Sequence, residues 1–250
     1  MLKVFYHIYG RYLMKTLIAA IRILINLISY NKELKKAQQL NKEGKIAERD
    51  AFVTPLVQKW AQFIIGITGK NTKVTVTGEE NIPKDSACVF IGNHQSYFDI
   101  PVLLAYANKP IAFIAKSEIK KVPFLNKWMD LMECTFLERN NPRQSVQAMA
   151  EAVENVKKGY SLVIFPEGHR SKGKPMQEFK PGSFKLAFRS EAPIIPVTID
   201  GTSKLYEENG LRSADVKLTI HPPVPTKGLS REEQAEVPAK VQKIIADSLK

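Results

Sequence analysis

The chain has 250 residues, of which 44% are hydrophobic and 25% are charged, and its formal net charge at pH 7 is +12. This length and balance are typical of a globular protein with one sizeable α/β domain, and they argue against a disordered chain. The positive charge predicts an anionic partner, either a membrane surface, a nucleic acid or a phosphorylated substrate.

The positive charge is concentrated in residues 1–70, which contain twelve Lys or Arg and four Asp or Glu. Residues 12–30 of this region are apolar at helical spacing, and their polar side chains recur on one narrow stripe. The longest stretch without a charged residue, Ile23–Asn31, is shorter than the ~18–20 apolar residues that a membrane-spanning helix needs. Arg22 interrupts the apolar run, which argues against a secretory signal.

A second amphipathic helix is predicted over residues 55–68, because Thr54 fits an N-cap and Pro55 fits a first helical residue. The charged, helix-prone segment 31–50 connects it to the first helix. Together the two helices predict a basic hairpin that lies in the interface of an anionic bilayer. Two alternatives remain open: both helices pack on the main core, or the hairpin spans the membrane.

From Lys73 onward, short apolar runs alternate with helical patterns. This alternation predicts an α/β fold with a mostly parallel sheet flanked by helices, preceded by the N-terminal amphipathic two-helix hairpin. The predicted division is residues 1–70 for the membrane-binding hairpin and residues 71–250 for the α/β domain. Strands are predicted over residues 73–77, 87–91, 111–115, 134–137, 161–165, 194–199 and 216–220, and helices over residues 120–132, 142–157, 183–190 and 231–249.

The two cysteines, Cys88 and Cys134, lie in apolar, strand-like runs. This setting favours buried free thiols in a reducing compartment over a disulfide. No Cys/His cluster has the spacing of a zinc site, so we expect no metal.

The first candidate site is the segment Asn93–Asp99, which follows the predicted strand 87–91. The ends of strands are where α/β folds place their chemistry. A turn can bring the Asp99 carboxylate onto one imidazole nitrogen of His94, which makes the other nitrogen a base. The alternative is that Asp99 caps the next helix and that His94 is an ordinary loop histidine.

Basic residues follow three other predicted strands: Lys116, Arg139 and Arg170. Three cations at the same edge of a parallel sheet would form a phosphate pocket next to His94, and arginine offers a forked set of donors for phosphate. Each cation taken alone is more typical of a solvated surface charge, and it is their shared position after strands that favours a pocket. Arg170 also lies three residues after Glu167, so a local ion pair in a surface turn is an alternative.

Four ordered segments resemble the motifs of the glycerolipid acyltransferases: Asn93–Asp99, Phe136–Arg139, Phe165–Ser171 and Ile195–Val197. Their order and spacing are most similar to the bacterial 1-acyl-sn-glycerol-3-phosphate acyltransferase (lysophosphatidic acid acyltransferase) group, over residues 73–200. The chain departs from that pattern at two positions. His169 stands where the family usually has Thr, and Glu138 stands where it often has Asp.

The resemblance implies transfer of a fatty acyl group from acyl-CoA or acyl carrier protein to the sn-2 hydroxyl of lysophosphatidic acid, giving phosphatidic acid without a cofactor. It implies that His94 is the general base and that Asp99 orients it. Ile195–Val197 would help to shape the donor side. We expect direct attack without a covalent enzyme intermediate, because Ser96 is poorly aimed at a base two residues away.

The resemblance also assigns the acceptor site. Lys116, Arg139 and Arg170 would hold the acceptor phosphate, while Glu167 and Gly168 would shape the site around it. The oxyanion donors are not identified by the sequence; backbone N–H groups near a helix start are the default expectation.

The expected location is the cytoplasmic face of the cell inner membrane, with peripheral or monotopic attachment to an anionic surface. Related alternatives are acylation of glycerol-3-phosphate or of another lysophospholipid at the same site. A further alternative is a non-enzymatic basic module that binds membrane or nucleic acid. We expect no nucleic-acid partner, because no helix-turn-helix, zinc-finger or aromatic RNA-binding signature occurs in the right context.

Overall fold

The computed structural model describes residues 2–138, 141–208 and 210–249. These residues form a seven-stranded sheet with the order β1-β7-β6-β2-β5-β3-β4. Neighbouring strands pair in parallel except β6 and β7, which are antiparallel. The predicted mostly parallel α/β fold is therefore confirmed. The strands are β1 (Lys73–Thr77), β2 (Val89–Gly92), β3 (Ile111–Lys116), β4 (Thr135–Leu137), β5 (Ser161–Ile164), β6 (Ile194–Asp200) and β7 (Asp215–Ile220).

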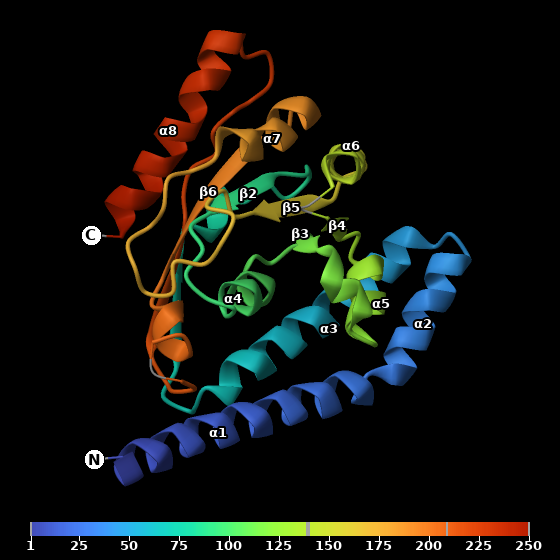
Figure 1. Cartoon of the computed structure of the whole chain (residues 1–250). Coiled ribbons are helices and arrows are strands. Elements are labelled where there is room, and N and C mark those ends of the chain that lie inside the picture. Colours follow the sequence, from blue (N-terminus) through green and yellow to red (C-terminus); the bar gives the residue numbers. More distant parts are fainter. Residues whose placement is uncertain (1, 139–140, 209, 250) are drawn as a thin grey trace.

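The helices cover both faces of the sheet (Figure 1). α3 and α4 lie on one face, and α6, α7 and α8 lie on the other, while α1 runs along the outside of α3. Layers on both faces bury the central strands β2 and β5 completely, which is why these strands read as continuous apolar runs. The α-helices are α1 (Leu2–Ser29), α2 (Asn31–Lys42), α3 (Ile46–Ile67), α4 (Asp99–Tyr106), α5 (Leu125–Leu131), α6 (Pro142–Lys157), α7 (Lys185–Ser190) and α8 (Arg231–Ser248).

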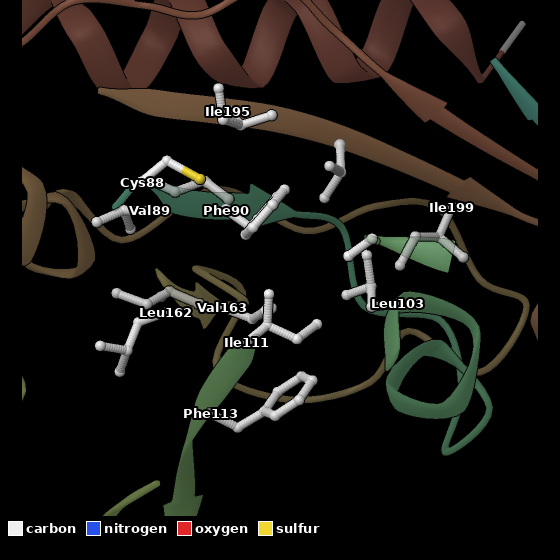
Figure 2. Close-up of a cluster of buried hydrophobic side chains, with 14 of the residues drawn as sticks. Cys88, Val89, Phe90, Leu103, Ile111, Phe113, Leu162, Val163, Ile195 and Ile199 are labelled. Atoms are coloured by element: carbon white, nitrogen blue, oxygen red, sulfur yellow. The ribbon is translucent and has the colours of Figure 1, made fainter. Parts of the chain in front are cut away.

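The core lies between the central strands and the helices that cover them (Figure 2). Phe90 of β2, Val163 of β5 and Ile195 of β6 are at most 1% exposed, and Leu103 of α4 closes one side of the same cluster. Cys88 lies within this core, and both cysteines are free and buried. The predicted state of the thiols is confirmed.

Two predicted helices of the α/β domain differ from the structure. The pattern over residues 120–132 divides into the 3₁₀ turn Ser117–Lys121 and α5. They are separated at Phe124, which has a φ of +65° and therefore cannot continue a right-handed helix. The pattern over residues 183–190 likewise begins with a 3₁₀ turn, Pro181–Phe184, before α7.

The N-terminal region contains three helices, so the predicted two-helix hairpin is wrong in detail. α3 begins at Ile46, and Pro55 lies inside it, not at its start. The Thr54 hydroxyl donates to the Asp50 carbonyl at 2.7 Å, which is a bond within a continuing helix. Pro55 and Ala51 are exposed, so the carbonyl that proline leaves without an N–H partner can face water.

The N-terminal helices differ in how they meet the rest of the chain. Ala61, Ile64 and Ile65 of α3 are buried and belong to the same apolar core as the sheet. α1 instead keeps a broad apolar face exposed. From residue 13 onward, its exposed large apolar side chains are Leu13, Met14, Leu17, Ile18, Ile21, Leu24, Ile25 and Ile28, with exposures between 42% and 72%.

Within the described residues, no single helix has the length and apolar character needed to cross a bilayer. Residues Leu13–Ser29 and Asn31–Lys42 satisfy those criteria only as a pair, with a bend of 50° between them.

One cation of the basic N-terminal region is not at the surface. Arg49 is 1% exposed and pairs with Asp50 and Glu133 at 2.8 and 2.9 Å. It also donates to the Tyr160 hydroxyl at 2.7 Å. Burial, followed by the negative charge of Asp50, raises the pKa of Tyr160 to about 12, and the positive charge of Arg49 only partly opposes this rise. Arg49 therefore ties α3 to the α/β domain and does not contribute to a membrane-facing charge.

Candidate active site

The candidate site begins where β2 ends, because Asn93 fixes the chain there. The Asn93 side chain donates to the Ile199 carbonyl and accepts from the Ile199 N–H, both at 2.8 Å. Gly92 is required at the preceding position, since a Cβ atom there would lie 2.6 Å from a methyl group of Val197. Ile195 and Val197 are fully buried in β6. The predicted motif Ile195–Val197 therefore supports the turn that follows β2, and it lies outside the cavity wall described below.

The predicted contact between His94 and Asp99 is present. Nδ1 of His94 lies 2.6 Å from Oδ2 of Asp99, and the Asp99 side chain is completely buried. The same oxygen accepts from the main-chain N–H groups of Gln95 and Ser96 at 2.7 and 2.9 Å. The Thr202 hydroxyl donates to the other oxygen, Oδ1. Three donors besides the imidazole therefore hold one buried carboxylate against one imidazole nitrogen.

The His94 ring is held by stacking as well as by the carboxylate. It lies parallel to the Phe165 ring, with an interplanar angle of 11° and 4.1 Å between the ring centroids. A carboxylate on Nδ1 favours the tautomer with the proton on that nitrogen, which leaves the Nε2 lone pair for a substrate. His94 keeps 16% of its side chain exposed and lines a large cavity.

Glu167 lies behind the dyad, outside the cavity wall. Its Oε1 accepts from the His94 N–H at 2.6 Å, its Oε2 accepts from the Gln177 N–H at 2.9 Å, and the residue is 1% exposed. Burial raises the pKa of Glu167, and the two main-chain donors partly offset that effect. Glu167 therefore contacts the site through the backbone of His94, and its role in shaping the acceptor site stays a prediction.

The cavity next to His94 has a volume of about 1120 Å³ and is lined mainly by apolar side chains. Its wall includes residues from α1 and α3 as well as from β3, α4, α5 and α6, so the N-terminal helices form part of the pocket. The apolar lining includes Leu27, Trp60, Ile64, Leu104, Phe113, Trp128, Met129, Met132, Leu137 and Met149.

The cavity wall also includes basic residues. Lys116 and Arg170 both line it, so the structure brings these two predicted cations to the cavity that contains His94. Gly168 lines it too, with a φ of +77° that favours glycine. The third predicted cation, Arg139, lies outside the described residues. His169, the departure from the family pattern, is exposed on the same wall.

The structure adds three polar residues that sequence reasoning missed. Thr202 supports Asp99, Glu207 pairs with Arg170 at 3.1 Å, and the Lys180 side chain lies over Gly168 on the cavity wall. Thr202 and Glu207 follow β6 by a few residues, in a segment without a recognisable motif. The only available signal was their position after a strand that ends at the same edge of the sheet as β2.

A buried carboxylate that holds an imidazole beside a partly basic, mainly apolar cavity is an arrangement suited to base-assisted chemistry on an amphipathic, anionic substrate. Residues 73–200 match the family described as Acyltransferase. The chain belongs to this acyltransferase family.

Individual relatives agree with this assignment. A Borreliella burgdorferi protein named 1-acyl-sn-glycerol-3-phosphate acyltransferase is 32% identical over 71% of this chain and 72% of its own length. The Brassica napus protein named 1-acyl-sn-glycerol-3-phosphate acyltransferase BAT2, chloroplastic, is 38% identical over 61% of this chain. This chain spans less than half, 45%, of that plant relative.

A solved structure matches nearly the whole chain. The crystal structure of the 1-acyl-sn-glycerophosphate (LPA) acyltransferase PlsC from Thermotoga maritima has a TM-score of 0.79 and 28% sequence identity. The match covers 96% of both chains, which includes the N-terminal helices as well as the sheet.

Proposed function

We propose that this protein transfers a fatty acyl group from acyl-CoA or acyl carrier protein to the sn-2 hydroxyl of 1-acyl-sn-glycerol-3-phosphate, giving phosphatidic acid. The observation that carries the proposal is the composition of one cavity. His94 lines it together with Lys116 and Arg170, most of its remaining wall is apolar, and its volume is large enough for an acyl chain. The names of the relatives from Borreliella and Brassica support the same acceptor.

In this mechanism, the acceptor phosphate binds at Lys116 and Arg170, which places the free glycerol hydroxyl at Nε2 of His94. Nε2 takes the hydroxyl proton while the oxygen attacks the thioester carbonyl carbon. The tetrahedral intermediate then collapses, the carbon–sulfur bond breaks, and the imidazolium returns the proton to the departing thiolate. Asp99 stabilises the imidazolium that exists between these two proton transfers.

Direct attack is supported by the surroundings of Ser96. Its hydroxyl donates to Glu207 at 2.5 Å and accepts from the Phe98 N–H at 3.0 Å, and the residue is fully buried. A serine held in this way does not present its oxygen to His94. The dyad is therefore proposed to act on the substrate hydroxyl itself.

The proposal is tested by incubating the full chain with lysophosphatidic acid and an acyl thioester. We expect phosphatidic acid and one equivalent of free thiol. The same assay with glycerol-3-phosphate and with a second lysophospholipid compares the alternative acceptors. Replacing acyl-CoA by an acylated acyl carrier protein compares the donors. Thiol release without a new ester, or no turnover with any acceptor, would contradict acyl transfer.

We also propose that α1 attaches the protein peripherally to an anionic membrane, on the cytoplasmic face of the inner membrane. Its exposed apolar face is broad, and exposed Lys15 and Arg22 lie on the same helix. Apolar side chains that enter the headgroup region, together with basic residues that meet anionic lipid, are the two requirements of interfacial binding. Such attachment would bring a lipid acceptor to the cavity, whose wall includes Leu27 of α1.

Replacing Leu17, Ile21 and Ile25 together by Gln should weaken binding to anionic vesicles by at least about tenfold, because each side chain loses transfer free energy on the order of 1 kcal/mol or more. Glutamine preserves helix propensity, so α1 itself should persist. Vesicle sedimentation measures the effect. The control is Val146→Gln on α6, which changes an apolar residue that is also exposed but lies on another helix. Unchanged sedimentation of the triple variant would remove α1 from membrane attachment.

A further inference from the structure

Glu207 connects two loops of the candidate site. Its Oε2 accepts from the Ser96 hydroxyl at 2.5 Å, and its Oε1 accepts from the Tyr97 N–H at 2.9 Å. Oε1 also accepts from Nη1 of Arg170 at 3.1 Å. The Glu207 side chain is 5% exposed, so these contacts are made largely out of water, where a charged hydrogen bond is stronger.

Arg170 is held from a second direction by an aromatic ring. The central carbon of its guanidinium lies 3.4 Å from the centroid of the Tyr97 ring, which is a close cation–π contact. The Tyr97 ring in turn lies 6.4 Å from the ring of Tyr206, the neighbour of Glu207. One carboxylate and one ring therefore fix both the position and the plane of a guanidinium that lines the cavity.

We propose that Glu207 is a positioning residue that determines how the acceptor phosphate is recognised, because it holds Arg170 in the orientation that phosphate requires. This inference rests on the function proposed above. Only one of the five N–H groups of Arg170 is engaged by Glu207, so others remain available for a bidentate contact with phosphate. A pre-positioned guanidinium loses little side-chain entropy when that contact forms.

The proposal predicts a change in acceptor binding that is opposite in direction to a simple effect of charge. Glu207 carries a negative charge beside the proposed phosphate site, so by Coulomb repulsion alone its removal would tighten acceptor binding. If orientation of Arg170 is the larger effect, removal of Glu207 weakens acceptor binding instead. The Michaelis constants for acceptor and donor, measured separately, therefore decide between the two.

The experiment compares Glu207→Ala and Glu207→Gln in the full chain. We expect Glu207→Ala to raise the KM for lysophosphatidic acid about tenfold, the size of one charged hydrogen bond, and to leave the KM for the acyl donor unchanged. Glu207→Gln should cause a smaller rise, because its amide oxygen can still accept from Tyr97 and Arg170. The matched control is Glu208→Gln, the adjacent carboxylate, which accepts from Ser203 and should leave both constants as they are.

Tyr97→Ala and Tyr97→Phe provide a second test if the Glu207 variants are too unstable to assay. Loss of the ring should raise the acceptor KM, and the phenylalanine variant should restore it, because the stacking face is retained. An acceptor KM that is unchanged or lower in Glu207→Ala and Tyr97→Ala would overturn the proposal. This holds even if kcat falls because the contact between His94 and Asp99 is disturbed. A wild-type protein that forms no phosphatidic acid would instead overturn the proposed function, and this inference with it.

Discussion

The His94→Ala variant is expected to lose acyl transfer by about 10³-fold or more, because a positioned general base contributes roughly 10²–10⁴-fold and alanine leaves no group that accepts the hydroxyl proton. The proposed phosphate-binding residues Lys116 and Arg170, which line the same cavity, are unchanged by this substitution. The loss should therefore appear in kcat, with KM values close to those of the wild type. Steady-state thiol release at saturating acceptor measures it.

The fold should survive this substitution, since His94 is partly exposed and its ring makes no interaction with the apolar core beyond the stack on Phe165. His221→Gln is the matched control: this histidine bonds Thr198 on the far side of β6 and takes no part in the proposed reaction. Thermal melting of both variants checks the fold. A His94→Ala protein that melts normally and turns over near the wild-type rate would end the assignment of His94 as the base.

The sheet was predictable because its signal is local. Each central strand is buried on both faces, so it appears in the sequence as a short β-branched or aromatic run bounded by turn residues. β1 and α6 match their predicted ranges, and α6 begins after Asn141, whose side chain accepts from the Gln144 N–H. α8 begins at its predicted first residue, Arg231, after a capping box formed by Ser230 and Glu233. These signals involve residues within four positions of one another.

The errors lie where contacts between distant parts of the chain decide the outcome. The pair Thr54 and Pro55 is compatible both with the start of a helix and with the interior of one, so the local sequence does not distinguish the two. The packing of α3 on the sheet favours the continuous helix. Arg49 is one basic residue among many in the sequence, but Asp50, Glu133 and Tyr160 allow its burial. No periodicity in the sequence reports such a pairing across 84 residues.

The candidate site shows the same division. His94 and Asp99 are five residues apart, so one turn joins them and the sequence sufficed to predict their contact. Thr202 and Glu207 reach the same turn from more than one hundred residues away, through the end of β6. Their roles depend on strand order, which places β6 next to β2, and strand order is not encoded by any short motif.

The second large loss of activity is expected for Asp99→Asn, because Asp99 makes the hydrogen bonds that hold His94. We expect kcat to fall by about 10²–10³-fold, because an amide can orient His94 but cannot stabilise the imidazolium with a negative charge. Asparagine fits the site if its oxygen keeps the position of Oδ2, where His94, Gln95 and Ser96 donate, and its NH₂ group faces Thr202. A threonine hydroxyl can rotate to accept from that NH₂ group, so the geometry is retained while the charge is lost.

The pH–rate profile provides the sharper measurement, in combination with Thr202→Val. Without the carboxylate charge, the protonated imidazole is less stable, so the acid limb of Asp99→Asn should move to lower pH. Valine at position 202 removes the hydroxyl that donates to Oδ1 of Asp99. The negative charge of the carboxylate is then less compensated, so it stabilises the imidazolium more strongly. Its acid limb should move to higher pH, with a loss in rate of about tenfold. Thr202→Ser keeps a hydroxyl and is the control. Shifts of both variants in the same direction would show that Asp99 does not act on His94 through its charge, and the dyad would then be a structural contact.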